Sequence, residues 1–248
     1  MIKEYRQRLI LDFLNRESKI SIKKLSQEFN VSDMTIRRDI KEFEKKQIVE
    51  LRNGVVFSKT FQPNLIPIEY RKTSQIIEKK RIGKKAATLI EDSDTIIIDS
   101  GTTTLELSIN LLDKNNLTVI TNDFNVANTL KKNHNIEIIF LGGKIHYPLD
   151  YLVTGCCCSK FLRDFGANKL FFSVQSIDLN KGIFTSDLDI ANVKKTMMDV
   201  AEETILLADH SKFNSWSKYR VSSFSDVDLL ITDKYLEYHD KKPSVIMV

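Results

Sequence analysis

The stretch Asn30-Val31-Ser32-Asp33-Met34-Thr35-Ile36-Arg37-Arg38-Asp39-Ile40 decides the fold of the N-terminal part of this chain. Its first two residues predict a short turn, and Ser32 is a residue type that commonly caps the start of a helix. Ile36 and Ile40 recur four residues apart, which places them on one edge of a helix. The stretch therefore predicts a turn followed by an amphipathic helix that is buried along one edge.

The opposite edge of this helix is strongly cationic. A helix-turn-helix motif needs this arrangement, because its second helix is held by an apolar edge while the far side enters the major groove of DNA. We predict that side chains near the helix start read bases, and these are Ser32, Met34, Thr35 and Arg38. Those expected to contact phosphates are Arg37, Lys41 and Lys45. A cationic helix face alone is as often a solvated surface, so the neighbouring elements must support this prediction.

Two helices before this stretch and a hairpin after it complete the predicted domain. The first helix spans about 3–16, and its inward side chains are expected to be Tyr5, Leu9, Phe13 and Leu14. The second helix begins at its cap, Ser21. Strands at 48–51 and 55–57 flank Arg52-Asn53-Gly54, where Asn-Gly suits the positive φ angles of a tight turn. Three helices and a hairpin predict a winged helix-turn-helix over residues 1–57, with Arg52 of the wing as a further DNA contact.

Charge is distributed unevenly along the chain. Residues 1–60 contain 14 Lys and Arg against 9 Asp and Glu, whereas the remainder contains 23 against 24. The excess of positive charge therefore lies where DNA phosphates would be met. One acidic residue of the cationic helix, Asp39, lies toward its apolar edge, and we interpret it as an internal salt-bridge partner of an arginine.

The sequence pattern changes after residue 57. Residues 58–75 contain Pro63 and Pro67 and show no clear period, so we interpret them as a linker. Helices then alternate with strands. The strands are expected at 95–99, 117–121, 137–141, 169–174, 204–208 and 229–232, with helices at 77–89, 103–112 and 125–132. This alternation predicts a Rossmann-like α/β domain over 76–248, in which helices cover both faces of a mostly parallel sheet.

The composition excludes several classes of protein. No segment approaches the ~18 apolar residues of a membrane span, and the charged start of the chain is unlike a signal peptide. The cysteines, Cys156–Cys158, are consecutive and have no histidine at a zinc-ligand spacing. We interpret them as small buried packing residues rather than as a redox switch. We therefore expect a cytoplasmic protein that uses no metal and no cofactor.

A polar loop follows the first predicted strand of the second domain. Asp99 ends the strand, and Ser100-Gly101-Thr102-Thr103-Thr104 leads into a helix. Gly101 permits a tight backbone path that leaves successive N–H groups at the positive end of the helix, and the threonine hydroxyls add donors. Such a loop suits a phosphate, although the same residues also fit an ordinary strand-to-helix turn.

Matching features follow other strands, whose carboxyl ends should meet at one edge of the sheet. They are Thr121 and Asn122 after the second strand, Gly142 and Gly143 after the third, and Asp209 and Lys212 after the strand at 204–208. Asp209 could accept hydrogen bonds from ligand hydroxyls, and Lys212 could supply positive charge. The alternatives are a loop-capping role for Asp99 and Asp209 and a solvated surface position for Lys212.

These residues carry a family resemblance. Val31-Ser32-x-x-Thr35-Ile36-Arg37-Arg38-Asp39-Ile40 closely resembles the VSxxTIRRDL signature of the DeoR family of bacterial regulators. The resemblance continues in order through Asp99–Thr104, Thr121-Asn122, Leu141-Gly142-Gly143 and Asp209-His210-Ser211-Lys212-Phe213. It implies a repressor of a sugar or sugar-phosphate operon, whose C-terminal domain resembles ribose-phosphate isomerase and senses a phosphorylated sugar. Helix-turn-helix heads usually act in symmetric pairs, so we expect a homodimer or homotetramer on double-stranded operator DNA.

The sequence also departs from the family pattern. Many relatives have Glu-Ala where this chain has Ile190-Ala191, and isoleucine cannot contact a sugar hydroxyl. Arg52-Asn53-Gly54-Val55 stands where many relatives have two glycines. The alternative function is a sugar-phosphate isomerase or deaminase that carries a DNA-binding head. Because such catalysis needs a positioned carboxylate base and Ile190 occupies a plausible carboxylate position, we expect no enzyme and no catalytic residues.

Overall fold

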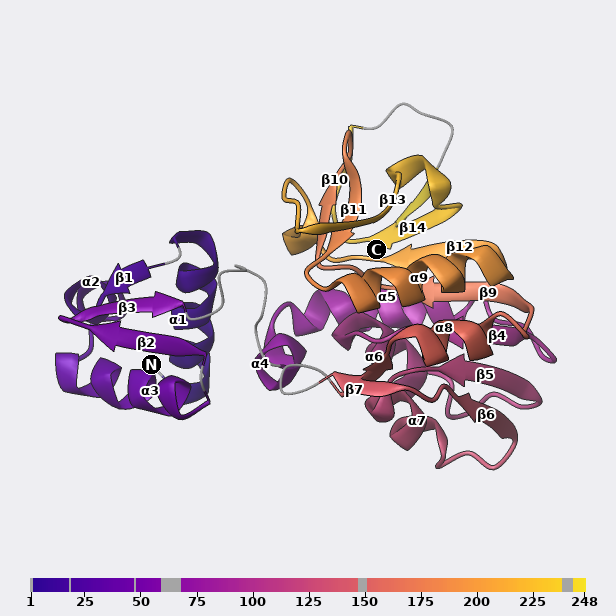
Figure 1. Ribbon diagram of the computed structural model, residues 1–248, viewed down its shortest axis with the longest axis horizontal. Helices are drawn as coiled ribbons and strands as arrows, with labels where there is room; N and C mark the ends of the chain where they lie inside the picture. The colour runs from indigo at the N-terminus through magenta and orange to yellow at the C-terminus, as the bar shows by residue number, and fades with distance from the viewer. Residues whose placement is uncertain (1, 18, 47, 59–67, 147–150, 238–242) are drawn as a thin grey trace. The chain divides into compact units, whose positions relative to one another are not determined.

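The computed structural model describes residues 2–17, 19–46, 48–58, 68–146, 151–237 and 243–248. The chain divides into two compact units, Met1–Tyr70 and Arg71–Val248 (Figure 1). Separate hydrophobic cores lie in the two units. In the described part of the chain, no helix has the length and apolarity that a membrane crossing requires.

Three helices and a small antiparallel sheet form the N-terminal unit (Figure 1). The helices are α1 (Lys3–Glu17), α2 (Ile22–Phe29) and α3 (Asp33–Lys45). The strands lie in the order β1 (Lys19–Ser21), β3 (Val55–Ser58) and β2 (Val49–Arg52). This confirms the predicted helices and hairpin. It adds β1, which is too short to show a period in the sequence.

The core of this unit is made by the faces that the helical periods predict. Its fully buried side chains come from all three helices and include Ile10, Leu25, Ile36, Ile40 and Phe43. Burying one such side chain contributes roughly 1.5–3 kcal/mol, so the helices depend on one another for stability. The expectation for Tyr5 is wrong, because its side chain is 49 % exposed. Arg6 and Gln7 are buried instead, since both reach a carboxylate on α3.

Seven strands form the sheet of the C-terminal unit. Their order is β15-β14-β12-β9-β4-β5-β6, and every neighbouring pair is parallel. In that order they span Ser244–Met247, Leu229–Thr232, Ala201–Leu207, Ala167–Phe172, Thr95–Ile98, Leu117–Thr121 and Ile136–Phe140. Six match strands expected from the sequence, and β15 is an additional edge strand. Because all seven run the same way, their carboxyl ends lie at one edge of the sheet.

Helices cover both faces of this sheet, as the sequence predicts. α5 (Ile76–Ala87), α6 (Thr102–Ile109) and α7 (Phe124–Leu130) share one apolar core with it. α8 (Cys156–Leu162) and α9 (Leu188–Val200) share the other. Gly83 of α5 lies against the α6 backbone, where a Cβ atom would stand 2.6 Å from the carbonyl carbon of Glu106. Only glycine allows the two helices to pack this closely.

Several short elements give no signal in the sequence. α4 (Ile68–Thr73) lies within the span interpreted as a linker, of which residues 59–67 lie outside the described part. β7 (Lys144–His146) pairs with β8 (Leu152–Thr154). A separate antiparallel sheet contains β10 (Ser176–Asp178), β11 (Gly182–Thr185) and β13 (Tyr219–Ser222). These strands are short and carry no regular apolar pattern that would identify them in the sequence.

The three cysteines begin α8. Cys158 is buried, and burial raises its pKa to about 11. Cys156 and Cys157 are exposed, so the interpretation of all three as buried packing residues is wrong for these two. Successive helical residues point about 100° apart, and here only the third faces the core.

Candidate functional site

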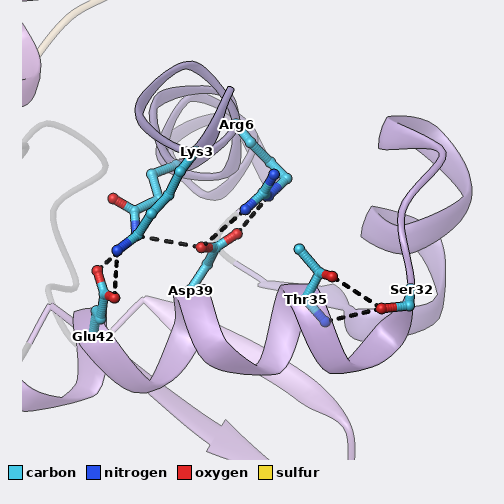
Figure 2. A network of polar contacts seen from close by, with 7 residues as sticks. Lys3, Arg6, Ser32, Thr35, Asp39 and Glu42 are labelled. Carbon is cyan, nitrogen blue, oxygen red and sulfur yellow. Dashed lines mark hydrogen bonds and ion pairs between the residues drawn. The ribbon is translucent and has the colours of Figure 1, made fainter. Parts of the chain in front are cut away.

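The predicted turn before α3 is confirmed in detail. Asn30 has φ 50°, the left-handed conformation that asparagine tolerates, and its N–H donates to carbonyls at the end of α2. Ser32 then caps α3, and its Oγ accepts a hydrogen bond from the Thr35 backbone N–H at 3.2 Å. The two hydroxyls also bind each other, with 2.9 Å between Ser32 Oγ and Thr35 Oγ1 (Figure 2). Ser32 and Thr35, two of the four predicted base-reading residues, therefore also hold the helix start in place.

The face of α3 opposite the core is exposed and cationic. Met34 is 74 % exposed, and the four basic side chains of this face, Arg37, Arg38, Lys41 and Lys45, are exposed as well. Among the described residues, none of these four side chains makes a hydrogen bond or an ion pair. A face with this charge and this freedom can meet a polyanion without first breaking internal bonds.

A buried ion pair fixes the other side of α3. The Asp39 carboxylate is fully buried and accepts from Arg6 Nε of α1 at 2.6 Å and from Arg6 Nη2 at 3.3 Å (Figure 2). Gln7 Nε2 donates to the same carboxylate at 3.4 Å. These bonds confirm the interpretation of Asp39 as a partner of an arginine. Because a buried charge must be paired, they fix the position of α3 against α1.

Glu42 extends this contact to the surface, one turn further along α3. It accepts from Lys3 Nζ at 2.6 Å and from Gln7 Nε2 at 2.8 Å. The hydrogen bonds from Lys3 and then Gln7 hold the pKa of Glu42 below its ordinary value, against a smaller opposing effect of burial. The α1–α3 contact thus has a buried centre and a half-exposed rim.

The wing has the predicted tight turn. Asn53 and Gly54 have φ angles of 48° and 76°, as a hairpin turn of this type requires. Arg52 is exposed, and both its Nε and Nη2 donate to the carboxylate of Glu50 at 2.8 Å. The cation of the wing is therefore already paired, unlike the cations of α3.

In the C-terminal unit, the predicted site residues gather at the carboxyl edge of the parallel sheet. Asp99 follows β4. Thr121 is the last residue of β5, and Asn122 follows it. Gly142-Gly143 lies beyond β6, and Asp209 lies beyond β12. Strand β9 lies between β12 and β4 and brings Ser173 into the same edge. The structure thus joins residues that are more than 100 positions apart in the sequence.

Asp99 has a partner that the sequence analysis missed. Its buried carboxylate binds the ammonium group of Lys194 in α9, which also donates to the Ser173 carbonyl at 2.8 Å. The Ser173 backbone N–H donates to Asp99 at 3.4 Å. Lys194 is buried and lies four residues after the buried Ile190, on the apolar edge of α9. This spacing was the available sequence signal that Lys194 faces inward. The bonds from Lys194 and Ser173 both reach Oδ2 of Asp99, and among the described residues its Oδ1 has no hydrogen-bond partner.

The threonine loop begins α6 and is almost fully buried. Thr104 Oγ1 donates back to the Gly101 carbonyl at 3.0 Å and so stabilises the first turn. Within the described residues, the hydroxyls of Thr102 and Thr103 have no hydrogen-bond partner. A Cβ atom on Gly101 would lie 2.0 Å from Ser173 Oγ, which shows how tightly this loop approaches β9.

The loop after β5 holds a buried acceptor. Asn122 Nδ2 donates to the Val153 carbonyl at 3.0 Å, whereas its buried Oδ1 has no partner among the described residues. Asp123 caps α7 and accepts from the Asn125 N–H at 2.6 Å. Gly142 has open space around it, since a Cβ atom there would meet nothing within 4 Å. Gly143 is confined, and its Cβ atom would stand 2.5 Å from the Thr154 carbonyl oxygen.

Asp209 lies between two lysines, one of which the sequence analysis missed. It is fully buried, with Oδ1 bound to Ser211 and Oδ2 lacking a partner in the described structure. Burial opposes its ionisation, but Lys212 and the bond from Ser211 together hold its pKa below the ordinary value. Lys79 of α5 is 2 % exposed, and burial, followed by the charge of Lys212, lowers its pKa to about 7. Two lysines and a carboxylate oxygen without a described partner thus share this end of the site.

Models of two protein domains match the chain. A DeoR-like helix-turn-helix domain matches residues 6–61, and a DeoR C terminal sensor domain matches residues 74–234. Together they cover the elements that carry both parts of the candidate site.

Full-length relatives support the same assignment. The HTH-type transcriptional repressor GlcR of Bacillus subtilis (strain 168) is 34 % identical over 94 % of this chain and 90 % of its own length. The glycerol-3-phosphate regulon repressor of Escherichia coli (strain K12) is 30 % identical over 90 % of this chain and 88 % of its own. Both relatives are transcriptional regulators, in agreement with the expectation that this chain is not an enzyme.

Solved structures resemble the C-terminal unit more distantly. Ribose 5-phosphate isomerase A from Methanocaldococcus jannaschii is 16 % identical over 56 % of this chain and 55 % of its own, with a TM-score of 0.41. That likeness is too weak to carry an argument about function. The two matching domains and the relatives decide the assignment: this chain belongs to the DeoR family of helix-turn-helix transcriptional regulators.

Proposed function

We propose that this regulator represses an operon for the uptake or breakdown of a sugar or sugar phosphate, and that a phosphorylated sugar controls its affinity for operator DNA. The observation that carries the proposal is the exposed cationic face of α3, whose opposite side is fixed by the Arg6–Asp39 ion pair. A rigid helix with unpaired cations on its free side is what major-groove recognition requires.

The DNA contacts that we propose follow the position of each side chain along α3. The base-reading candidates lie at its start and are Ser32, Met34, Thr35 and Arg38. The phosphate contacts lie on its flank, further along and in the wing, and are Arg37, Lys41, Lys45 and Arg52. Arg52 must exchange Glu50 for a phosphate, so we expect it to contribute less than the α3 cations.

The effector proposal rests on the chemistry of the strand-end loops. The N–H groups at the start of α6 and the charge of Lys212 suit a phosphate. The unpartnered oxygens of Asn122 and Asp209 suit donors such as sugar hydroxyls. The set of effector contacts that we propose is Ser100, Gly101, Thr102, Thr103, Thr104, Thr121, Asn122, Gly142, Gly143, Asp209 and Lys212, with Asp99 as their organiser. The regulon named for the relative in E. coli is that of a phosphorylated polyol, which supports this ligand class.

Ile190 bears on which effector fits. Its side chain is buried in the first turn of α9, one turn before Lys194. An apolar side chain here offers no partner to a ligand hydroxyl, so we propose an effector that is less polar at this point than the usual sugar phosphates of the family.

Two copies of the chain are needed to give a helix-turn-helix head useful affinity. One head buries a small surface, and two symmetric heads bind two half-sites about one helical turn apart. We therefore propose a homodimer or homotetramer on a palindromic operator.

The direct test is a gel-shift titration with the full chain and the DNA upstream of its own gene and of neighbouring sugar operons. We expect a specific complex that weakens steeply between about 50 and 200 mM salt. Fructose 6-phosphate, glucose 6-phosphate, fructose 1-phosphate and glycerol 3-phosphate are then added one at a time, and one should release the DNA. Arg38→Ala should abolish the complex, and Lys132→Ala, at an exposed position just beyond the end of α7, is the charge-matched control. Absence of any specific complex would contradict the proposal.

A further inference from the structure

The last turn of α4 is held by a lysine from the next helix. Carbonyls at the end of a helix lack intrahelical partners. Here Lys79 Nζ of α5 donates to the Arg71 carbonyl at 2.7 Å and to the Ser74 carbonyl at 2.6 Å. Gln75, with φ 49°, makes the sharp turn that lets α5 fold back and bring Lys79 to this point.

Charged groups beyond the end of β12 affect the pKa of the same Lys79 amine. Lys212 and Asp209 act on it from the loop after β12, Arg71 from α4 and Glu106 from α6. Lys212 and Arg71 disfavour its charged form, whereas Asp209 and Glu106 favour it. Lys79 is therefore shared between the proposed effector site and the end of α4.

A second bond ties α4 to another loop of the site. Lys72 Nζ donates to Asn125 Oδ1 at 3.1 Å. Asn125 is in the first turn of α7, which Asp123 caps directly after Thr121 and Asn122. Both attachments of α4 thus lead to strand-end loops that carry proposed effector contacts.

α4 also has a special place along the chain. The division between the two compact units falls within it, between Tyr70 and Arg71. The end of α4 therefore lies near the point in the sequence where the chain passes from the helix-turn-helix unit to the sensor unit.

We propose that Lys79 couples the proposed effector site to α4. An anion bound beside Lys212 strengthens the hydrogen bonds from Lys79 to the Arg71 and Ser74 carbonyls at the end of α4. This inference rests on the proposed function only in assuming that the site takes an anion. Lys79 is a positioning residue in this account, because it acts on α4 and need not touch the ligand.

The physical basis is the protonation state of Lys79. Burial lowers the pKa of Lys79 to about 7, so its amine gains or loses a proton near neutral pH. A phosphate dianion nearby favours the ammonium form. Hydrogen bonds from an ammonium group are roughly twice as strong as those from a neutral amine. Anion binding should therefore draw in a proton and tighten the bonds to Arg71 and Ser74.

The experiment measures hydrogen–deuterium exchange of residues 68–75 in the full chain at pH 7, with and without inorganic phosphate. We expect phosphate to slow exchange there by roughly three- to tenfold in the wild type. Lys79→Met should remove this protection, and Lys80→Met, the exposed neighbour on the same helix, should keep it. Calorimetry in buffers of different ionisation enthalpy should show that the wild type takes up more protons for each phosphate bound than Lys79→Met does, because the protons that phosphate itself releases on binding are common to both proteins.

A second variant covers the case in which Lys79→Met does not fold. Lys72→Ala removes only the half-exposed bond to Asn125, and it should weaken the protection of residues 68–72 while the thermal shift caused by phosphate remains. Phosphate-induced protection that is equal in the wild type and in Lys79→Met would overturn the coupling role. So would phosphate binding, seen as a thermal shift, without any change at 68–75. Absence of phosphate binding would instead refute the proposed effector class, and with it the trigger of the coupling.

Discussion

The guanidinium group of Arg6, on α1, clamps the buried carboxylate of Asp39, on α3, with 2.6 Å between Nε and Oδ2. The two residues are 33 positions apart, and no other ion pair described within the N-terminal unit is fully buried. Apolar packing alone would let α3 rotate slightly about its axis. A directional ion pair removes that freedom, so the cationic face is presented in one orientation.

Removing this clamp should unfold the N-terminal unit. Asp39→Ala leaves Arg6 as an unpaired buried charge, which typically costs about 3–5 kcal/mol. A small domain has little more stability than that to lose. Urea unfolding followed by hydrogen exchange of α1 and α3 would measure the change. Asp33→Ala, an exposed carboxylate in the same helix, is the control and should cost less than ~1 kcal/mol. An Asp39→Ala chain as stable as this control would contradict the prediction.

Ser32 has two possible roles, and one pair of variants separates them. Ser32→Ala removes the cap of α3, with an expected loss of about 0.5–2 kcal/mol in stability. Ser32→Asp keeps a capping acceptor but places a negative charge at the DNA-facing end of the helix. Thermal unfolding should therefore show near-wild-type stability for Ser32→Asp, while gel shifts show weaker operator binding than for Ser32→Ala. Equal binding by the two variants would mean that this helix end does not face a polyanion.

The pairing of Arg52 with Glu50 predicts a gain of affinity. Glu50→Gln removes the carboxylate that competes with DNA for the wing cation. We expect operator affinity to rise a few-fold at low salt, and the slope of log K against log salt to steepen by up to about 0.9 if one more phosphate is neutralised. The double variant with Arg52→Ala should lose this gain. Titrations at several salt concentrations would decide, and an unchanged slope would place the wing away from the phosphates.

The sequence predicted the elements whose signals are local. The Ser32 cap, the Asn30 turn, the Asn53-Gly54 hairpin and six parallel strands each depend on neighbouring residues, through caps, turn chemistry and apolar periods. Even the Asp39 ion pair was accessible, because an acidic side chain on an apolar helix edge needs a buried cation.

Which of two adjacent lysines in a helix faces the core was not identified from the sequence. Lys79 and Lys80, and likewise Lys194 and Lys195, are identical in the sequence, yet one of each pair is buried and the other exposed. Helical spacing after Ile190 was a signal for the burial of Lys194, but its ion-pair partner Asp99 is 95 positions away in the sequence. Short strands such as β7 and β8 were missed for a related reason, since only their pairing in space defines them.

The stability of the C-terminal unit should depend on pH through Lys79. Its pKa falls from 10.5 in the unfolded chain to about 7 in the folded one, so between these values the unfolded chain binds more protons. The free energy of unfolding therefore rises with pH from about 7 toward 10, with a slope of up to about 1.4 kcal/mol per pH unit from this group. Lys79→Met should remove that rise, and Lys80→Met should keep it. Denaturant titrations between pH 7 and 9 on the three chains measure the difference, and parallel curves for wild type and Lys79→Met would contradict the shift.

The contact between Gly101 and Ser173 predicts a substitution that can be rescued. A Cβ atom in Gly101→Ala would lie 2.0 Å from Ser173 Oγ, so that hydroxyl must move and release the Ser100 carbonyl that it binds at 3.3 Å. Overpacking of this kind typically costs about 1–3 kcal/mol, and the displaced loop should also lose any phosphorylated ligand. Gly142→Ala, where the new methyl group meets open space, is the matched control and should keep wild-type stability. Adding Ser173→Gly to Gly101→Ala removes the clashing hydroxyl, so the double variant should recover most of the lost stability in thermal unfolding. If it recovers none, the damage comes from the backbone of the loop itself, and the tight approach of Gly101 to β9 does not determine the conformation of the site.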